Sequence, residues 1–381
     1  IYHPKQDERQ IALAVKYDTK PLWSEIELIF GVGETGAAIV LAAYEAWFAG
    51  RAVSYSRNRN YYGAHRHRLI RHAAVTQAVD KLAAAGWIIH YKQARGRRGW
   101  QSALEATEDL IDAINEIFAD RPRLRLARLP QTTILRDAEG QPMGFNRTRA
   151  IDRRDRKTED FNAIIAAAEI EHFDNSNVFG LGSPMARIYN QTFARGGRYY
   201  ANGTSWQNIK KEARKKLTIN GEPVAEIDFD GMHVAMLYAQ SGLPIPQSCY
   251  DIAGWPRDLV KVATLTLINA KNVHSARLSI AHSDGRKIDL VTGQPITESN
   301  DKKLMQAVTS PGSPEAIAKA AKLIDLIKIR HAPIANQLHR DAGARLMQLD
   351  AEIAEAVMTE MMLRQGGVAL PIHDSYLVPI P

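Results

Sequence analysis

Cysteine is nearly absent from this sequence, and so are long apolar runs. Cys249 is the single cysteine in 381 residues. That excludes a disulfide framework and a cysteine-rich zinc site, and it suits a reducing cytoplasm. The longest apolar stretch, GAAIVLAAYEAWFAG, carries Glu45 and is too short to cross a bilayer. The first ten residues are polar and charged, unlike a secretory signal. We therefore expect a cytoplasmic protein without a membrane partner, in which this stretch forms a core helix.

Several familiar cofactor motifs are also missing. No G-x-x-x-x-G-K-[ST] segment occurs, which excludes a P-loop motor. GVGETG fits G-x-G-x-x-G, but no clear strand precedes it and no acid follows at the distance that a ribose contact needs, so we interpret it as a chance match. His65, His67 and His72 lie among arginines without carboxylate or cysteine partners, which favours surface histidines over a metal site.

Positive charge is concentrated in one segment. The formal net charge is +7, whereas residues 51–100 hold nine Arg and two Lys against the single acid Asp80. That segment alone contributes +10, so the remainder sums to −3. Such a basic region, rich in arginine and interleaved with Tyr55, Tyr61, Tyr62 and Trp100, is typical of a surface that binds a phosphate backbone.

The same region has the element order of a winged helix-turn-helix. Apolar residues at 75, 79, 82 and 83 share one helical face, and Gly86 is suited to end that helix. WIIHYK, ARGRRG and WQSALEAT then predict strand, turn and strand. We expect residues 1–120 to form a DNA-binding domain, with a recognition helix at 72–85; a protein-interaction module of the same shape is the alternative. The expected nucleic-acid contacts here are Arg57, Arg59, Arg66, Arg68, Arg71, Gln77, Lys81, Lys92, Arg95, Arg97 and Arg98.

Residues 121–180 are less regular. TTILRDAEGQPMGF predicts a hairpin around Glu139–Gly140, and NRTRAIDRRDRKTED is a charged run. We interpret this segment as a connection between domains, with a helix at about 159–172 and a loop after it.

Chemistry-bearing residues gather in the C-terminal half. PVAEIDFDGMHVAMLYAQSG predicts a strand that ends at Asp228, followed by a helix with Met232, Met236 and Leu237 inward. GGVALPIHDSYLVPIP predicts two apolar strands joined at a tip that carries Asp374. Two acids at neighbouring strand ends can share metal ions, orient an attacking hydroxyl and neutralise a leaving pyrophosphate. Asp230 is a second acid of the first segment, and it is interpreted as an additional ligand or a turn residue.

Between these segments lies a helical stretch with a cationic face. In WPRDLVKVATLTLINAKN, residues Arg257, Lys261, Leu265 and Asn269 follow one another at intervals of four. That spacing brings them onto one helical face, against which a triphosphate would fit.

The three segments together resemble motifs A, B and C of family A DNA polymerases and of the related single-subunit RNA polymerases. DFDGMHVAMLYAQSG aligns with motif A, the Arg257-to-Asn269 face with the R-x3-K-x3-F-x3-Y face of motif B, and HDS with motif C of the RNA polymerases. RGGRYYA and LMQLDAEIAEAVM resemble flanking segments. The resemblance covers about 190–381 and implies an α+β chain: a winged helix-turn-helix, then at 181–381 a reduced right-hand palm and fingers without an exonuclease or full thumb.

Two departures from the family bear on its substrate. His233 replaces the glutamate that excludes a 2′-hydroxyl in the DNA polymerases, and Asn269 replaces tyrosine. The choice between NTP and dNTP therefore stays open. Leu265 replaces Phe or Met in an apolar role.

The resemblance implies roles for specific residues. Asp228 and Asp374 would be catalytic and would hold Mg²⁺, or Mn²⁺, with the backbone of Phe229. Arg257 and Lys261 would neutralise the triphosphate, with His233, Leu265 and Asn269 beside the nucleotide. Arg198 and Gln207 would contact the template strand.

The expected function is that of a primase-polymerase of a mobile genetic element, acting on a DNA template with NTP or dNTP. A single-strand-binding protein or a helicase is a further expected partner. The alternatives are a DNA-binding replication initiator with an inactive palm, and a primer-dependent DNA or RNA polymerase.

Overall fold

The computed structural model describes residues 10–62, 68–92, 101–119, 126–172, 181–209, 211–283 and 313–380. The chain divides into two compact units. The first comprises Ile1–Phe193, Gly197–Asp228 and Glu352–Pro381, and the second comprises Ala194–Gly196 and Phe229–Ala351. Both helices and strands are present, so the α+β prediction is confirmed at that level.

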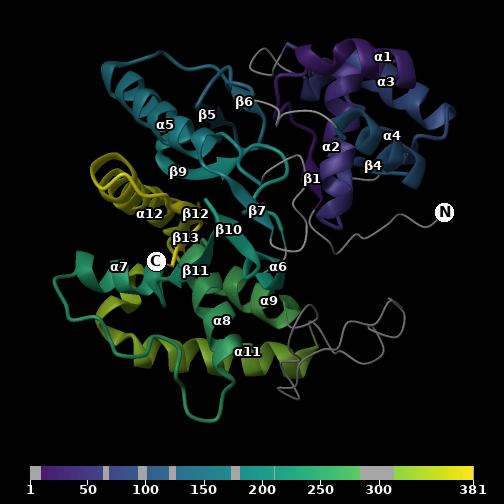
Figure 1. Cartoon of the computed structure of the whole chain (residues 1–381). Coiled ribbons are helices and arrows are strands. Elements are labelled where there is room, and N and C mark those ends of the chain that lie inside the picture. The colour runs from purple at the N-terminus through teal and green to yellow at the C-terminus, as the bar shows by residue number, and fades with distance from the viewer. Residues whose placement is uncertain are drawn as a thin grey trace. The chain divides into compact units, whose positions relative to one another are not determined.

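The N-terminal part of unit 1 packs helices on a four-stranded sheet (Figure 1). Its sheet has the order β1-β2-β4-β3, with β2 and β4 antiparallel and β4 and β3 antiparallel. Its strands are β1 (Ile11–Ala12), β2 (Val53–Tyr55), β3 (Ile88–Tyr91) and β4 (Ser102–Ala106). Its helices are α1 (Trp23–Phe30), α2 (Glu34–Phe48), α3 (His72–Ala84) and α4 (Glu108–Phe118). The expected helix at 72–85 and the two strands after it are confirmed as α3, β3 and β4, whereas strand β2 within the basic segment was not expected.

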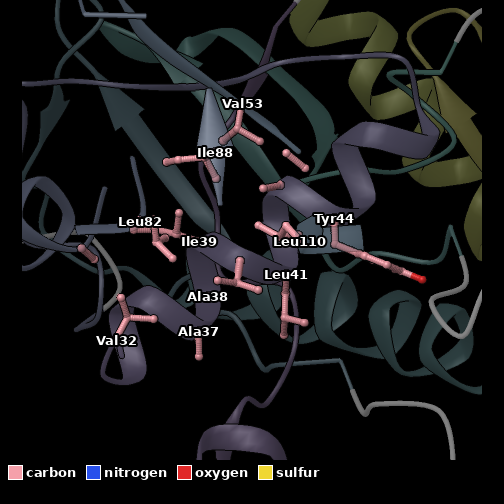
Figure 2. Close-up of a cluster of buried hydrophobic side chains, with 14 of the residues drawn as sticks. Val32, Ala37, Ala38, Ile39, Leu41, Tyr44, Val53, Leu82, Ile88 and Leu110 are labelled. Atoms are coloured by element: carbon pink, nitrogen blue, oxygen red, sulfur yellow. The ribbon is translucent and has the colours of Figure 1, made fainter. Parts of the chain in front are cut away.

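Helix α2 is the centre of this part, as its apolar sequence predicts. Ile39 and Val40 are fully buried, and Figure 2 shows Ile39 among Leu82, Ile88 and Leu110 from other elements. The GVGETG segment is the turn between two helices, because Gly31 ends α1 with a φ of 63° and Gly33 precedes α2. Its interpretation as a chance match to a dinucleotide motif is therefore consistent with the structure.

Lys16, a buried lysine, links this part to the rest of unit 1. Lys16 Nζ donates to Glu45 Oε1 at 2.6 Å and to the Thr204 carbonyl at 2.8 Å, and Tyr17 Oη donates to the same Glu45 oxygen. Burial raises the pKa of Glu45 and lowers that of Lys16, while their mutual attraction opposes both changes. Buried charges are tolerated when each is paired and hydrogen-bonded in this way.

The middle of unit 1 is a second sheet covered by a long helix. The sheet has the order β6-β5-β8-β9, with β5 and β8 parallel. Its strands are β5 (Thr133–Arg136), β6 (Pro142–Met143), β8 (Met185–Asn190) and β9 (Thr192–Ala201). The predicted hairpin is confirmed, and Gly140 has the positive φ of 78° that such a turn needs.

The sequence predicts an irregular connection at the charged run NRTRAIDRRDRKTED, but most of this run is helical. Helix α5 extends over Arg149–Ala167 and begins ten residues before the expected start. Thr148 caps it by accepting a hydrogen bond from the Ile151 amide, and Asp155 is buried in its first half. Asp155 accepts from Thr132 and Thr133, so a carboxylate supplies the inward position that the sequence pattern expects to be apolar.

The third sheet of unit 1 carries both candidate aspartates. It has the order β12-β13-β11-β10-β7. Its strands are β7 (Ile170–His172), β10 (Leu217–Ile219), β11 (Glu222–Asp228), β12 (Leu370–Ile372) and β13 (Ser375–Pro379). Short helix α6 (Lys211–Arg214), the end of α12 (Gly343–Met358) and the π-helical turn η5 (Thr359–Arg364) belong to the same unit. Trp206, Met358 and Tyr376 share its core.

Unit 2 is helical. It contains α7 (Met232–Gln240), α8 (Arg257–Asn269), α9 (Val273–Ser283), α11 (Pro314–Arg330), the turn η4 (Ala332–Gln337) and the start of α12. Helices α8, α9 and α11 pack on one another, as Figure 1 shows in green. His331 is buried behind them, with Nδ1 3.1 Å from the Tyr238 hydroxyl and Nε2 2.9 Å from the Cys249 carbonyl.

Candidate active site

Strand pairing brings the two candidate aspartates to the same end of neighbouring strands. Antiparallel strands β11 and β13 pair Asp228 with Ser375. In the β12–β13 hairpin Ile372 pairs with Ser375, which leaves His373 and Asp374 as the two turn residues. Directly paired residues of antiparallel strands have Cα atoms about 4.5 to 5.5 Å apart. The predicted strand ending at Asp228 and the predicted tip bearing Asp374 are both confirmed as structural elements.

The turn that carries Asp374 has an unusual backbone. His373 has a φ of 57°, in the left-handed region that non-glycine residues seldom occupy and that His, Asn and Asp tolerate best. The ring of Tyr200 meets the His373 imidazole edge-on, with centroids 6.1 Å apart. Such conformations persist where surrounding contacts impose them, and they occur often at functional sites.

Two side chains hold the strand just before this turn. Trp206 Nε1 and Gln207 Nε2 both donate to the Pro371 carbonyl, at 2.9 and 2.8 Å. Trp206 is fully buried, so its indole is fixed by packing as well. The position of the Asp374 turn therefore depends on residues about 165 positions earlier in the chain.

Gln207, which is expected to contact the template strand, is also part of this support. Its Oε1 accepts from the Ala201 amide, and its Nε2 also donates to the Tyr199 carbonyl. Both ends of the amide are thus engaged within unit 1, which is why we interpret Gln207 as a residue that positions the hairpin. Sequence alone contains no sign of these partners, because they lie on β9 and β12.

Glu226, a further acid on the strand of Asp228, was not anticipated. Glu226 lies two residues before Asp228, hence on the same face of β11. Arg214 Nη2 and Nε donate to its two oxygens at 3.1 and 3.2 Å, and Ser375 Oγ donates to Oε1 at 3.1 Å. Burial raises the pKa of Glu226, but the Arg214 bonds and charge outweigh it and hold that pKa below the ordinary value. The period of two from Asp228 is the signal that could have identified Glu226.

The donor set suits a cation that keeps part of its water shell. Among the residues that the structure describes, no group of three or more His, Cys, Asp and Glu side chains could enclose a metal. A carboxylate pair is nevertheless what Mg²⁺ commonly uses in proteins, with waters and substrate phosphates as its other ligands. Phe229, whose carbonyl is the third expected ligand, follows Asp228 directly and has a ring that is 44% exposed.

In unit 2, the expected triphosphate contact Arg257 is paired with a neighbouring acid. Its Nη2 donates to Asp230 Oδ1 and Oδ2 at 2.8 and 2.9 Å. The guanidinium also lies 5.5 Å from the centroid of Tyr250, and Lys261 Nζ lies 5.9 Å from the same ring. The hydrogen bonds and charge of Asp230 raise the pKa of Arg257, so the guanidinium stays charged. Tyr250 is buried, and it was missed because nothing in its sequence context marks it.

The remaining positions of this face are partly accessible. Helix α8 begins at Arg257 and ends at Asn269, which confirms the predicted helix; Lys261 and Leu265 are half-buried between these two exposed residues. Asn269 Nδ2 donates back to the Leu265 carbonyl at 2.7 Å. His233 lies in the first turn of α7 and is half-buried. The helix after Asp228 and the inward positions of Met232, Met236 and Leu237 are confirmed.

The N-terminal basic region presents an exposed helical face. Helix α3 buries Val75, Val79 and Leu82 and exposes Gln77 and Lys81, as the sequence predicts. Gly86 follows this helix with a φ of 82°. The predicted strands on either side of the turn are confirmed as β3 and β4.

Two of the expected cationic contacts are engaged within the protein. Arg57 forms two hydrogen bonds with Asp80, at 2.7 and 2.8 Å, which lower the pKa of Asp80. Arg68 pairs with Glu34. His72, expected at the surface, is half-buried, with Nε2 3.0 Å from the Arg57 carbonyl.

The other expected contacts divide into three groups. Arg59, Arg71 and Lys92 are exposed. Arg198 is half-buried on β9. Outside the described residues lie Arg66, Arg95, Arg97 and Arg98, together with His65 and His67.

No known family model, curated protein or solved structure matches this chain. Within the described ranges, no single helix has the length and apolar character needed to cross a membrane. Helices α1 and α2 reach that length and apolar composition only when taken together, as a pair bent by 85°.

Proposed function

We propose that this chain is a template-dependent nucleotidyl transferase that acts as a primase-polymerase. One observation carries the proposal: the register that pairs Asp228 with Ser375 and so brings Asp228 and Asp374 to one end of adjacent antiparallel strands. Two acids in this arrangement are what phosphoryl transfer through bound divalent cations requires. Strand β11, helix α8 and the β12–β13 hairpin follow one another along the chain in an order that resembles that of the family A motifs.

Asp228 and Asp374 would hold Mg²⁺, or Mn²⁺, with the Phe229 carbonyl. When bound, the cation supplies Lewis-acid stabilisation of the charge that develops on the attacking and leaving oxygens. Two carboxylates suffice for this, because the phosphates of the incoming nucleotide complete the ligand set. The protein's own contribution is to hold both carboxylates at a fixed register, with Trp206 and Gln207 supporting the strand before the turn.

The nucleotide would lie against the cationic face of α8. Arg257 and Lys261 both lie near the buried ring of Tyr250. This contact would limit the conformations from which the two side chains reach the phosphates of the nucleotide. Arginine suits this task because its planar donors match phosphate oxygens. His233 and Asn269 provide no acidic group against a 2′-hydroxyl, which supports use of NTP as well as dNTP.

The N-terminal part would bind template DNA as a winged helix-turn-helix. Its β2-β4-β3 order, with α3 placed between β2 and β3 in the chain, supports that assignment. Gln77 and Lys81 on the exposed face of α3 would approach a groove, and Arg59, Arg71 and Lys92 would contact phosphates. A palm and fingers joined to such a domain would form a reduced polymerase suited to a mobile genetic element.

Nucleotide incorporation on a single-stranded template tests the proposal. The full chain is incubated with Mg²⁺ and labelled NTP or dNTP, with and without an annealed primer. Synthesis without primer supports the primase-polymerase, whereas synthesis only from a primer identifies a polymerase proper. DNA binding without synthesis under any of these conditions would instead favour a replication initiator with an inactive palm.

A further inference from the structure

Helix α5 carries three exposed arginines for which the described part of the chain provides no acidic partner. Arg149, Arg153 and Arg156 recur at intervals of four and three residues and are all exposed. We call these three residues the α5 arginine stripe. Within the part of the chain that the structure describes, no hydrogen bond or ion pair engages their side chains. They therefore present three free positive charges on one helical face.

Three of the four acids of the same helix are paired with arginines outside it. Arg147 pairs with Asp152 and Asp155 at 2.6 and 2.7 Å, and Arg128 pairs with Glu159 at 3.0 Å. Asp160 lies on the exposed face one turn beyond Arg156 and marks the end of the stripe. The helix as a whole is nearly balanced in charge, yet its exposed N-terminal half is positive.

This arrangement works against helix stability. The N-terminus of a helix carries partial positive charge, so acids are favoured there and arginine is not. Arg149 is nevertheless the first residue of α5. A feature that opposes local stability is more readily explained by binding than by folding.

We propose that the α5 arginine stripe is a contact surface for the phosphate backbone of duplex DNA. Seven residues of helix separate Arg149 from Arg156, or about 10 Å, over which one strand of a duplex carries roughly three phosphates. The only aromatic residue of α5, Phe161, is fully buried, so this helix offers no ring on which an unpaired base could stack. The surface thus suits a paired backbone and not single-stranded bases.

The inference goes beyond the proposed synthesis, because it concerns binding and is tested without nucleotide or Mg²⁺. Duplex DNA of arbitrary sequence is titrated against the full chain at several salt concentrations. Replacing Arg149, Arg153 and Arg156 together by Gln is expected to reduce the slope of log K against log salt by about 2 to 3. A control variant, with Lys271, Lys322 and Lys328 of unit 2 replaced by Gln, removes the same formal charge and should leave most of the slope.

Two outcomes of the titration would overturn the proposal. An equal loss in both variants would mean that only net charge matters. A larger loss on single strands than on duplex would assign the surface to unpaired nucleic acid. A failure of synthesis leaves the titration unaffected, so the two proposals are separable.

A thiol reporter tests the location directly. Because the single native cysteine, Cys249, is buried, an Arg153→Cys variant adds one accessible thiol. Duplex DNA is expected to slow alkylation of that thiol severalfold. The control Ala167→Cys lies on the same exposed face about 20 Å farther along the helix and should react at an unchanged rate. An unchanged rate at 153, or equal protection at both positions, would contradict the assignment.

Discussion

The Arg257 guanidinium donates to both oxygens of the Asp230 carboxylate from a single nitrogen, with Nη2 2.8 Å from Oδ1 and 2.9 Å from Oδ2. Both residues belong to unit 2, and Asp230 lies only two positions after Asp228. The carboxylate has the charge and the oxygen donors that a nucleotide phosphate would bring. Asp230 is thus both a turn residue, as one of its two interpretations expects, and the counter-ion of Arg257, and under the proposed function it would compete with the nucleotide for that guanidinium.

Removing this counter-ion should favour nucleotide binding. In Asp230→Asn, Arg257 no longer has to leave an ion pair, so the KM for the nucleotide falls by about twofold to fivefold, the range for a solvent-exposed pair. Steady-state incorporation kinetics measure it. Arg257→Gln should raise KM instead, and Asp258→Asn, a change at the next exposed acid of α8, should do little. An increased KM in Asp230→Asn would contradict this role.

Asn269 lies directly over Gly343, so a larger residue at 343 requires the Asn269 side chain to move. A Cβ at Gly343 would lie 1.6 Å from Asn269 Oδ1, with no backbone strain involved. Because Asn269 is exposed and its amide can rotate away, Gly343→Ala should destabilise unit 2 by about 1 kcal/mol, the low end of the cost of overpacking. Urea unfolding measures the change. Adding Asn269→Ala should restore much of it, and strictly additive effects would show that the contact is not the cause.

Much of the candidate site follows from local sequence patterns. Val224 precedes Asp228 on an apolar strand, and the run from Gly367 to Pro379 is apolar on both sides of a polar tip, so the strands could be predicted. Arg257 and Lys261 could be placed on one helical face by their spacing alone. The pairing of Asp228 with Ser375 could not be predicted, because β11 and β13 are about 150 residues apart in the chain.

Two features that the sequence did not indicate have a common physical origin. The start of α5 was missed because Asp155, an inward-facing residue, is acidic and satisfied by Thr132, Thr133 and Arg147 from outside the helix. The support that Gln207 gives to the hairpin could not be predicted because its partners on β9 and β12 are distant in sequence. In both cases tertiary hydrogen bonds decide the role of a polar residue.

Acidification should weaken the Glu226–Arg214 contact. Since the pKa of Glu226 is lowered in the folded protein, its contribution is present at neutral pH and is lost as pH falls from the ordinary Glu value through the lowered one. In Arg214→Gln, burial acts without the guanidinium and the pKa of Glu226 rises. The stability gap between wild type and this variant should be largest at neutral pH and narrow in acid. Unfolding measured across pH tests it, with Arg364→Gln, at the exposed Glu360 pair, as the control.

Trp206 should be the most sensitive support of the Asp374 turn. Its side chain is fully buried and donates to the Pro371 carbonyl, so Trp206→Ala should destabilise the protein by about 3 to 5 kcal/mol. Trp206→Phe keeps most of the volume and leaves Gln207 bonded to Pro371, so its cost should be nearer 1 kcal/mol. Denaturant unfolding compares them. Similar losses would show that the hydrogen bond, and not packing, dominates.

Nucleotide incorporation by carboxylate variants tests whether Asp228 and Asp374 carry the proposed chemistry. Asp228→Asn and Asp374→Asn keep side-chain size but remove the charge that would hold the cation, while Asp325→Asn changes an exposed acid of α11. We expect template-dependent incorporation in Mg²⁺ to be lost in the first two variants, with duplex binding unchanged, and to be retained in the third. Incorporation at the wild-type rate in Asp374→Asn or Asp228→Asn would contradict this expectation.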